Sequence, residues 1–147
     1  MLIENDVGLR RVLTAGRVIA VVGLSADSRR PSHGVARYML ANGYQVVPVN
    51  PKENEILGQR CYARLADIPQ SVDIVVCFRK SEYIPAIAEE AIAIGARTLW
   101  LQLGIHNETA EQRAVAAGLD VVADHCFETE HARLIGALQP SGSPQQG

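Results

Sequence analysis

The sequence predicts an α/β fold, an open parallel five-stranded sheet with helices on both faces. Five short runs rich in Val, Ile and Leu are mostly continuous rather than alternating. Strands buried on both faces of a parallel sheet have this pattern. Helical patterns that end at glycine lie between several of these runs, and such repeated units require right-handed crossovers. The 147 residues, 48% hydrophobic and 20% charged, suffice for one globular domain with one core.

The expected strands follow an N-terminal helix, which should run from about Asn5 to Ala15 and pack on the outside of the sheet. On the fourth strand, Trp100 and Gln102 share one face. We expect Trp100 to pack against a helix, and stacking on an adenine is the alternative. The five strands are VIAVVG (18–23), QVVPVN (45–50), DIVVCF (73–78), TLWLQLG (98–104) and LDVVAD (119–124).

Three helices are expected between the strands. The first covers 35–41, and Ser32 precedes it as a candidate N-cap. The second lies in SEYIPAIAEEAIAIG, where Pro85 is tolerated because it falls in the first turn. The third lies in NETAEQRAVAAG and has Asn107 as its N-cap. The residues that end these helices are Gly43, Gly95 and Gly118.

The segment PKENEILGQRCYARLADIPQSV, between the second and third strands, is too polar and interrupted for a long helix. We expect one short turn at 63–68 and a path across the carboxyl edge of the sheet, where such folds bind ligands. The final QPSGSPQQG has no apolar anchor, which predicts a disordered tail. The chain thus divides into an N-terminal helix (1–17), one domain (18–135) and that tail (136–147).

Several classes of protein are disfavoured by composition. No apolar run approaches the roughly 20 residues of a membrane span, and the N-terminus does not resemble a secretory signal. We therefore expect a cytoplasmic protein with no membrane partner. A net charge of −2 argues against a nucleic-acid partner. The three cysteines have no paired spacing, and neither C-x-x-C nor H-E-x-x-H occurs, so we expect neither a disulfide framework nor a metal site.

Polar and cationic residues follow four of the expected strands, whose ends meet at one edge of a parallel sheet. After the first strand, serine hydroxyls, loop N–H groups and the positive end of the next helix can hold phosphate, and two adjacent arginines can each donate two hydrogen bonds. These features predict an anion-binding rim. Its residues are Gly23, Ser25, Ala26, Asp27, Ser28, Arg29, Arg30 and Ser32, then Asn50, Pro51 and Lys52, then Phe78 and Arg79, and finally Gln102, Leu103 and Gly104.

The pattern at this rim disfavours NAD. An NAD site has G-x-G-x-x-G after the first strand and an acidic residue after the second. This chain has G-x-S-x-x-S, and Lys52 stands near the acidic position. A lysine there favours a ligand with an extra phosphate, which is the 2′-phosphate of NADP or the 3′-phosphate of coenzyme A (CoA). The residues alone leave both ligands open.

Four stretches resemble the small stand-alone CoA-binding proteins, which are similar to the N-terminal CoA-binding domain of the succinyl-CoA synthetase α subunit. They are GLSADSRRPSHGVARYMLANGYQVVPVNPK, EILGQRCYARLADIP, DIVVCFRKSEYIPAIAEEAIAIGARTLWLQLGIHNETA and AAGLDVVADHCFETEHARL. The resemblance covers roughly 18–134 and implies a Rossmann-like fold with CoA as the cofactor.

The resemblance also implies roles for individual positions. Residues 25–28 would contact the phosphates of the coenzyme, and Lys52 would face its ADP end. Phe78 and Arg79 would border the adenine or the pantetheine, and residues 102–104 would line the thiol arm. The synthetase loop has glycine where this chain has its two adjacent arginines, so Arg29 and Arg30 rest on the physical argument.

No catalytic group is expected. The synthetase uses a phosphohistidine in a second domain, and no matching motif occurs here. His125 and His131 are expected to cap or pack, and Cys126 to fill space rather than form a mixed disulfide with CoA. The leading hypothesis is a non-catalytic CoA- or acyl-CoA-binding protein, a carrier or sensor. The alternatives are an NADP-dependent oxidoreductase, an acyl-CoA enzyme lacking its partner subunit, and a protein-interaction module with a vestigial nucleotide pocket.

Overall fold

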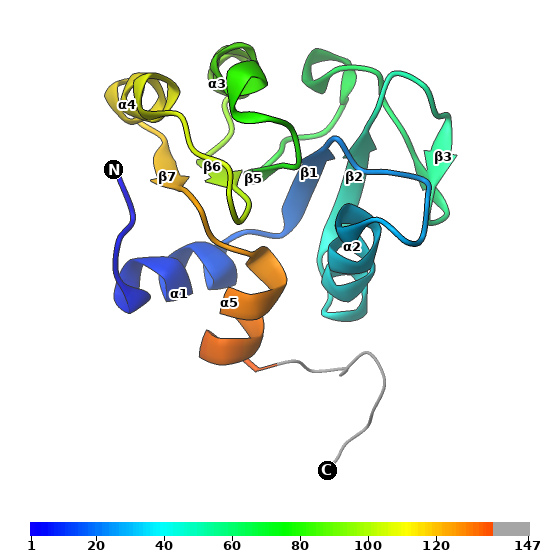
Figure 1. The fold of residues 1–147 in the computed structure, drawn as a ribbon, viewed down its shortest axis with the longest axis horizontal. Helices are drawn as coiled ribbons and strands as arrows, with labels where there is room; N and C mark the ends of the chain where they lie inside the picture. The colour runs from blue at the N-terminus through cyan, green and yellow to red at the C-terminus, as the bar shows by residue number, and fades with distance from the viewer. Residues whose placement is uncertain (137–147) are drawn as a thin grey trace.

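The computed structural model describes residues 1–136, so the expected tail, apart from Gly136, lies outside the described residues. Its centre is a five-stranded sheet in the order β2-β1-β5-β6-β7, and every neighbouring pair is parallel (Figure 1). The predicted fold class and all five expected strands are confirmed. The strands are β1 (Val18–Val22), β2 (Gln45–Val49), β5 (Ile74–Cys77), β6 (Thr98–Leu101) and β7 (Asp120–Val122).

Helices cover both faces of the sheet, as predicted (Figure 1). On one face lie α1 (Asp6–Ala15), α2 (Pro31–Ala41) and α5 (Phe127–Leu134), and on the other lie α3 (Ile84–Ala93) and α4 (Glu108–Ala116). Sequence reasoning missed α5, a helix of 8 residues, FETEHARL, because it is short and mostly polar and buries only Phe127 and His131. Among residues 1–136, no helix has the length and apolar character needed to cross a bilayer.

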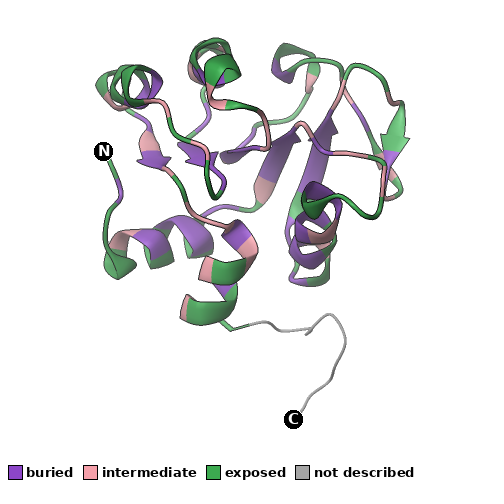
Figure 2. Cartoon of the chain, viewed as in Figure 1, coloured by how far each residue is buried: buried purple, intermediate pink, exposed green. Residues whose placement is uncertain are grey.

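The strands are apolar without alternation because each contributes side chains to two cores. In β1, Ile19 and Val21 belong to the core beneath α1, α2 and α5. The intervening Ala20 and Val22 belong to the core beneath α3 and α4. Figure 2 shows these strands as almost wholly buried. The continuous apolar runs therefore reflect a sheet covered on both sides.

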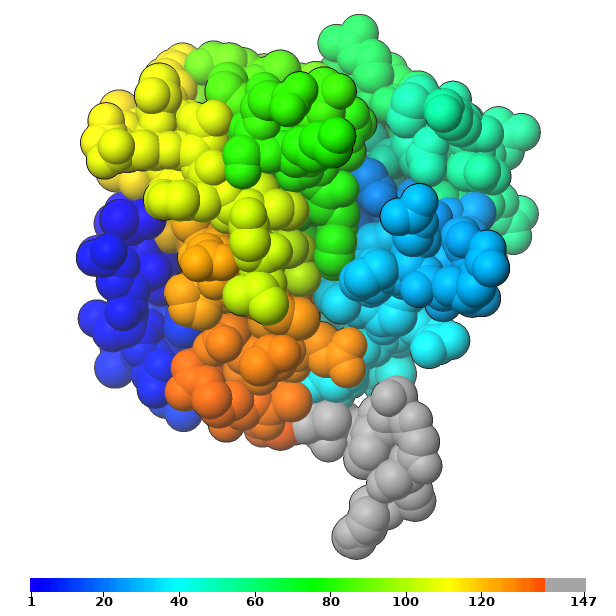
Figure 3. All heavy atoms as spheres, viewed as in Figure 1, coloured from blue at the N-terminus to red at the C-terminus, as the bar shows by residue number. Residues whose placement is uncertain are grey.

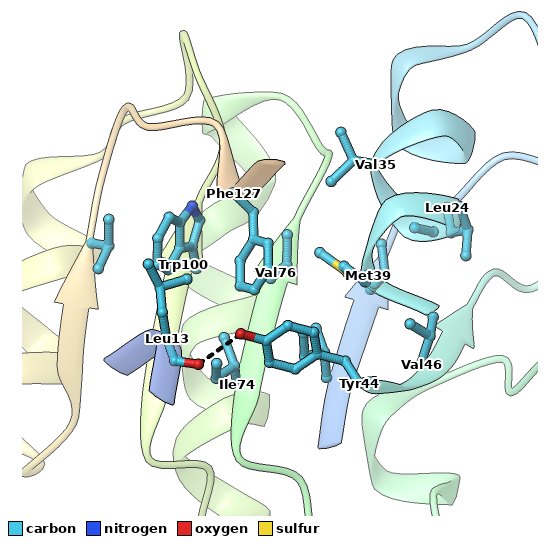
Figure 4. Packing of buried hydrophobic residues seen from close by; sticks show 14 of the residues in the cluster. Leu13, Leu24, Val35, Met39, Tyr44, Val46, Ile74, Val76, Trp100 and Phe127 are labelled. Atoms are coloured by element: carbon cyan, nitrogen blue, oxygen red, sulfur yellow. Dashed lines mark hydrogen bonds between the residues drawn. The ribbon is translucent and has the colours of Figure 1, made fainter. Parts of the chain in front are cut away.

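Trp100 lies fully buried in the first of these cores, so the expectation that it packs against a helix is confirmed. Its ring centroid is 5.1 Å from that of Phe127, the first residue of α5 (Figure 4). Its Nε1–H donates to the His125 carbonyl oxygen at 2.9 Å. In the same core, the Tyr44 hydroxyl donates to the Leu13 carbonyl oxygen at 2.6 Å and ties α1 to the start of β2.

Local capping explains where the helices begin, with one correction. Asn107 caps α4 as predicted, accepting from the third N–H beyond it, and Pro85 falls in the first turn of α3. The prediction for α2 was wrong, because this helix begins at Pro31 rather than at residue 35. Proline is favoured at a first helical position, since its fixed φ already suits a helix. Ser32 is therefore inside the helix rather than its N-cap.

The connection between β2 and β5 contains a hairpin that the sequence did not reveal. Its strands are β3 (Glu55–Ile56) and β4 (Gln59–Arg60), and a 3₁₀ turn, η1 (Leu65–Asp67), falls inside the expected 63–68. Leu57 and Gly58 form the tip, with φ of 54° and 73°. Asn-Gly is the usual signal for such a turn, and leucine gives none. Beyond the hairpin, Tyr62 pairs with Val49, so the connection lies beside β2.

Candidate functional site

The strand order places a topological switch point between β1 and β5. From β1 the chain passes through α2 to β2 on one side, and it then returns to the other side of β1 to form β5. In open α/β sheets, ligands bind beyond the carboxyl ends of the strands at this point. A cleft of about 670 Å³ opens there, and we name it the switch-point cleft. It is lined by Gly23, Ser25, Arg30, Pro31, Ser32, Val49, Asn50, Pro51, Lys52, Phe78 and Arg79.

Gly23 lets the exits of β1 and β5 approach each other closely. Its φ is +85°, which side-chain-bearing residues rarely adopt. A Cβ at this position would lie 2.6 Å from the Phe78 carbonyl oxygen and 2.9 Å from Arg79 Cδ. Glycine is therefore required twice, for the backbone turn and for the contact between the two strand ends.

Serine hydroxyls hold the loop that follows β1. Ser32 Oγ accepts from the Ser25 N–H, and Ser25 Oγ accepts from the Asp27 N–H, both at 3.0 Å. Each hydroxyl keeps its own hydrogen to donate. Arg30, the N-cap residue of α2, makes no side-chain capping bond, and the first turn of this helix lines the cleft. The positive end of α2 is thus available to an anion.

The two adjacent arginines have different surroundings. Arg29 is bound to Asp27, with Nε 3.0 Å from Oδ1 and Nη2 3.0 Å from Oδ2, and these hydrogen bonds lower the pKa of the Asp27 carboxyl. The Arg29 side chain is 88% exposed and lies outside the residues that line the cleft. Arg30 does line it. One arginine therefore stabilises the loop, and the other is free for a ligand.

Asn50 connects the ends of β1 and β2. Its Nδ2 donates to the Leu24 carbonyl oxygen at 3.0 Å, and its Oδ1 accepts from the Lys52 N–H at 2.8 Å. The backbone N–H of Asn50 also donates to the Tyr62 carbonyl oxygen at 2.9 Å. These bonds fix the turn that brings Lys52 to the rim of the cleft. The Lys52 side chain is exposed.

The third cation comes from the end of β5. The Arg79 guanidinium lies over the Tyr83 ring, 4.3 Å from its centroid. This contact restricts a long side chain that also lines the cleft. Arg30 at the start of α2, Lys52 after β2 and Arg79 after β5 thus line one cleft, and no carboxylate is among its described lining residues. The cleft is suited to a ligand with several negative charges.

Comparison with known proteins decides the family. The CoA binding domain family matches residues 17–132. The chain belongs to this CoA-binding domain family. It is 40% identical over 124 residues to the uncharacterized protein YneT of Bacillus subtilis strain 168, and the match covers 84% of this chain and 92% of YneT. A solved hypothetical protein from Pyrococcus horikoshii OT3 is similar with a TM-score of 0.88 and 40% identity, over 90% of this chain and 94% of that protein.

CoA-binding portions of larger enzymes are also similar. The ADP-forming acetate–CoA ligase II of Archaeoglobus fulgidus is 28% identical over 98 residues, which are 65% of this chain. The match spans only 15% of the length of the ligase. The resemblance to small CoA-binding proteins and to synthetase-type CoA-binding domains is thereby confirmed.

The other expected site residues of this CoA-binding domain lie outside the lining of the switch-point cleft. Gln102 is 4% exposed, and its Oε1 accepts from the Phe127 N–H at 3.0 Å, so it fixes the start of α5. Leu103 is 70% exposed at the tip of the loop after β6. The Gly104 N–H donates to Asp124 Oδ1 at 2.7 Å. The remaining members of this group are Ala26, Asp27, Ser28 and Arg29, all in the loop after β1.

Two residues that line the switch-point cleft were not predicted from the sequence. Val49 ends β2, and Pro31 begins α2, and both adjoin residues that were expected. Neither carries a polar side chain, so their residue types gave no signal. The position of each next to a strand or helix end was the one available indication.

His131, Cys77 and Cys126 of the CoA-binding domain lie in packed surroundings. His131 is buried, its Nδ1 is 2.7 Å from the Tyr38 hydroxyl, and desolvation lowers its pKa. Burial raises the pKa of the Cys77 thiol. Cys126 is half-buried against the core as the N-cap residue of α5. Within residues 1–136, no group of three or more His, Cys, Asp or Glu side chains could hold a metal ion.

Proposed function

We propose that this protein binds CoA or an acyl-CoA in the switch-point cleft. The observation that carries the proposal is the convergence of Arg30, Lys52 and Arg79 on a cleft whose lining, within residues 1–136, contains no carboxylate. CoA carries a pyrophosphate and a 3′-phosphate, and so needs cations and N–H donors at more than one point. The Ser32 hydroxyl and the positive N-terminal end of α2 lie at the same cleft.

Binding without chemistry is the function that this lining supports best. Its polar members are serine, asparagine, arginine and lysine, which bind and orient phosphate. In the part of the chain that the structure describes, the cleft lining contains none of the His, Cys, Asp or Glu side chains that most often act as general bases or nucleophiles. We therefore propose a carrier or sensor of CoA or of an acyl-CoA rather than an enzyme.

Calorimetric titration of the purified protein with CoA, 3′-dephospho-CoA, NADPH and NAD tests the ligand. We expect CoA to bind most tightly and removal of the 3′-phosphate to weaken binding about 10- to 100-fold, because a hydrogen bond to a charged group contributes about 1.5–3 kcal/mol. Tighter binding of NADPH than of CoA would refute the proposal and favour a redox protein.

Matched variants test the site. Lys52→Ala should weaken the binding of CoA more than that of 3′-dephospho-CoA. Lys80→Ala, at an exposed position outside the lining, should change neither affinity. Arg30→Ala should weaken both ligands, and its neighbour Arg29→Ala should have a much smaller effect because Arg29 is bound to Asp27. Equal effects of Arg29→Ala and Arg30→Ala would place the phosphates elsewhere.

A further inference from the structure

A second cleft, of about 640 Å³, lies beyond the ends of β6 and β7. We name it the α4 cleft, because α4 forms one wall. The opposite wall is the N-terminal segment 2–4, and the loops after β6 and β7 close the remaining side. Figure 3 shows the N-terminal residues (dark blue) and α4 (yellow) at one side of the molecule, far from the loop after β1 at the other side. The volume of the α4 cleft is in the range of small-molecule sites.

The N-terminal wall is fixed by the sheet. The Ile3 N–H donates to the Val121 carbonyl oxygen at 2.8 Å, and the Val121 N–H donates to the Met1 carbonyl oxygen at 2.9 Å. Leu2 forms a parallel bridge with Val121, so these residues continue the sheet beyond β7. The side chain of Ile3 is buried, while Leu2 remains 42% exposed beside the cleft. The N-terminal wall of the cleft is thus held in place by hydrogen bonds to β7.

Apolar side chains line much of this cleft, and two oriented histidines stand with them. Leu2, Val115 and Ala123 are among the apolar lining residues. His106 Nδ1 lies 2.9 Å from Glu111 Oε2, and His125 Nδ1 donates to the Ala123 carbonyl oxygen at 2.7 Å.

Glu111 is itself buried, and its Oε2 also accepts from the Asn107 N–H at 2.7 Å. Each imidazole is therefore held through Nδ1. Neither Nε2 atom has a hydrogen-bond partner among residues 1–136, so each can bond to a polar group of a ligand that enters the cleft.

The two clefts have opposite charge. The switch-point cleft is lined by three cations and no carboxylate. Among residues 1–136, the lining of the α4 cleft includes the carboxylates Glu4, Glu108, Glu111 and Asp124 but no lysine or arginine, and His106 is paired with Glu111. A single ligand that reaches both clefts would place its phosphates in the first and an uncharged end in the second. The charges thus set the direction in which such a ligand lies along the carboxyl edge.

The pantetheine arm of CoA is comparable in length to the spacing between the strands at whose ends the two clefts lie. From β1 to β7 there are three strand spacings, because β5 and β6 lie between, and at about 4.8 Å each these span about 14 Å. The arm has about as many chain atoms as four amino-acid residues, and an extended chain of that length spans about 14 Å. On the way lies the loop after β6, whose exposed Leu103 offers apolar surface and whose Gly104 is hydrogen-bonded to Asp124 of the α4 cleft.

We propose that the α4 cleft binds the acyl group of a CoA thioester, and that it selects acyl chains that are apolar and carry no carboxylate. This inference rests on the proposed binding of CoA in the switch-point cleft. The apolar wall contributes affinity for the chain, and the carboxylates that have no cationic partner in the lining, Glu4, Glu108 and Asp124, exclude a dicarboxylic acyl group such as succinyl by repulsion.

The test is calorimetric titration with CoA, hexanoyl-CoA and succinyl-CoA. We expect hexanoyl-CoA to bind at least about tenfold more tightly than CoA, because each buried methylene contributes about fourfold in affinity. Succinyl-CoA should bind no more tightly than CoA. Equal affinities for hexanoyl-CoA and CoA, or a preference for succinyl-CoA, would overturn the inference while CoA binding itself stood. A lack of binding by all three would refute the proposed function and this inference with it.

Two variants locate the acyl group. Ala116→Trp places a ring in the α4 cleft from the exposed end of α4, and should remove the advantage of hexanoyl-CoA while the affinity for CoA stays unchanged. Ala117→Trp, at the exposed next residue outside the lining, is the control and should change neither affinity. Glu108→Gln should raise the affinity for succinyl-CoA alone. Persistence of the hexanoyl advantage in Ala116→Trp would show that the chain binds elsewhere.

Discussion

Substitution of Gly23 by alanine tests the central feature of the site, the close approach of the β1 and β5 exits. A left-handed backbone costs a non-glycine residue about 1–2 kcal/mol. The added Cβ also meets the Phe78 carbonyl oxygen at 2.6 Å, and that atom belongs to backbone that cannot rotate away. Overpacking of this kind costs about 1–3 kcal/mol, and alanine recovers about 0.4–1 kcal/mol through the unfolded chain. We expect a net loss of about 3 kcal/mol.

Thermal and urea unfolding measure this loss. For a chain of this size the expected decrease in Tm is about 10 °C, since 1 kcal/mol corresponds to roughly 3–4 °C. The added Cβ should push the ends of β1 and β5 apart and so alter the switch-point cleft between them. CoA binding should therefore weaken at a temperature where the variant is still folded.

Two other glycines separate the strain from the clash. Gly43 has φ of +89° but open space where a Cβ would lie, so Gly43→Ala should cost only about 1 kcal/mol. Gly34 lies within α2 with neither strain nor close neighbours, so Gly34→Ala should stabilise by about 0.5–1 kcal/mol. If Gly23→Ala is no more destabilising than Gly43→Ala, the contact between the two strand exits does not constrain this position.

Three further predictions concern local contacts. Asn107→Ala removes the N-cap of α4 and should reduce the free energy of unfolding by about 1 kcal/mol in urea titrations. Ser32→Ala removes the acceptor of the Ser25 N–H, so it should cost about 1–3 kcal/mol of stability and weaken CoA binding by calorimetry. The hydrogen bond to Glu111 raises the pKa of His106 above 6.5. His106 therefore contributes stability that is fully present below pH 6.5 and is lost as the pH rises through its folded pKa. The excess stability of wild type over His106→Asn should accordingly be larger at about pH 5.5 than at about pH 8.5.

Each of these has a contrary outcome. Asn107→Asp keeps a capping oxygen and should retain most of the stability that alanine loses; equal losses would mean that the cap contributes little. Ser32→Thr keeps the hydroxyl and should retain CoA binding; an equal loss of binding in Ser32→Thr and Ser32→Ala would mean that the hydrogen bond to the loop does not support the site. A His106→Asn difference that is constant with pH would show that the ion pair with Glu111 does not stabilise the fold.

The sequence predicted the framework well because the framework depends on local patterns. Strands covered on both faces must be apolar at successive positions, as in VIAVV of β1, and this pattern, with helices between the strands, identified the parallel sheet. The sequence pattern did not reveal α5. The position of this helix depends on Phe127 entering the core beside Trp100 and on the hydrogen bond from the Phe127 N–H to the Gln102 side chain. The sequence pattern also missed the β3–β4 hairpin, because the leucine at its tip gives no turn signal.

By itself, the sequence determined the sheet, the places where helices separate its strands, and the polar residues that follow the strand ends. Those properties follow from spacing along the chain. Only the tertiary structure decided that Arg30 lines the cleft while Arg29 binds Asp27, and that Ser32 holds the loop instead of capping a helix. It also brought Lys52 together with Arg79 by placing β1 between β2 and β5. The physical reason is that the direction of a side chain and the order of strands are set by long-range packing, which no local pattern contains.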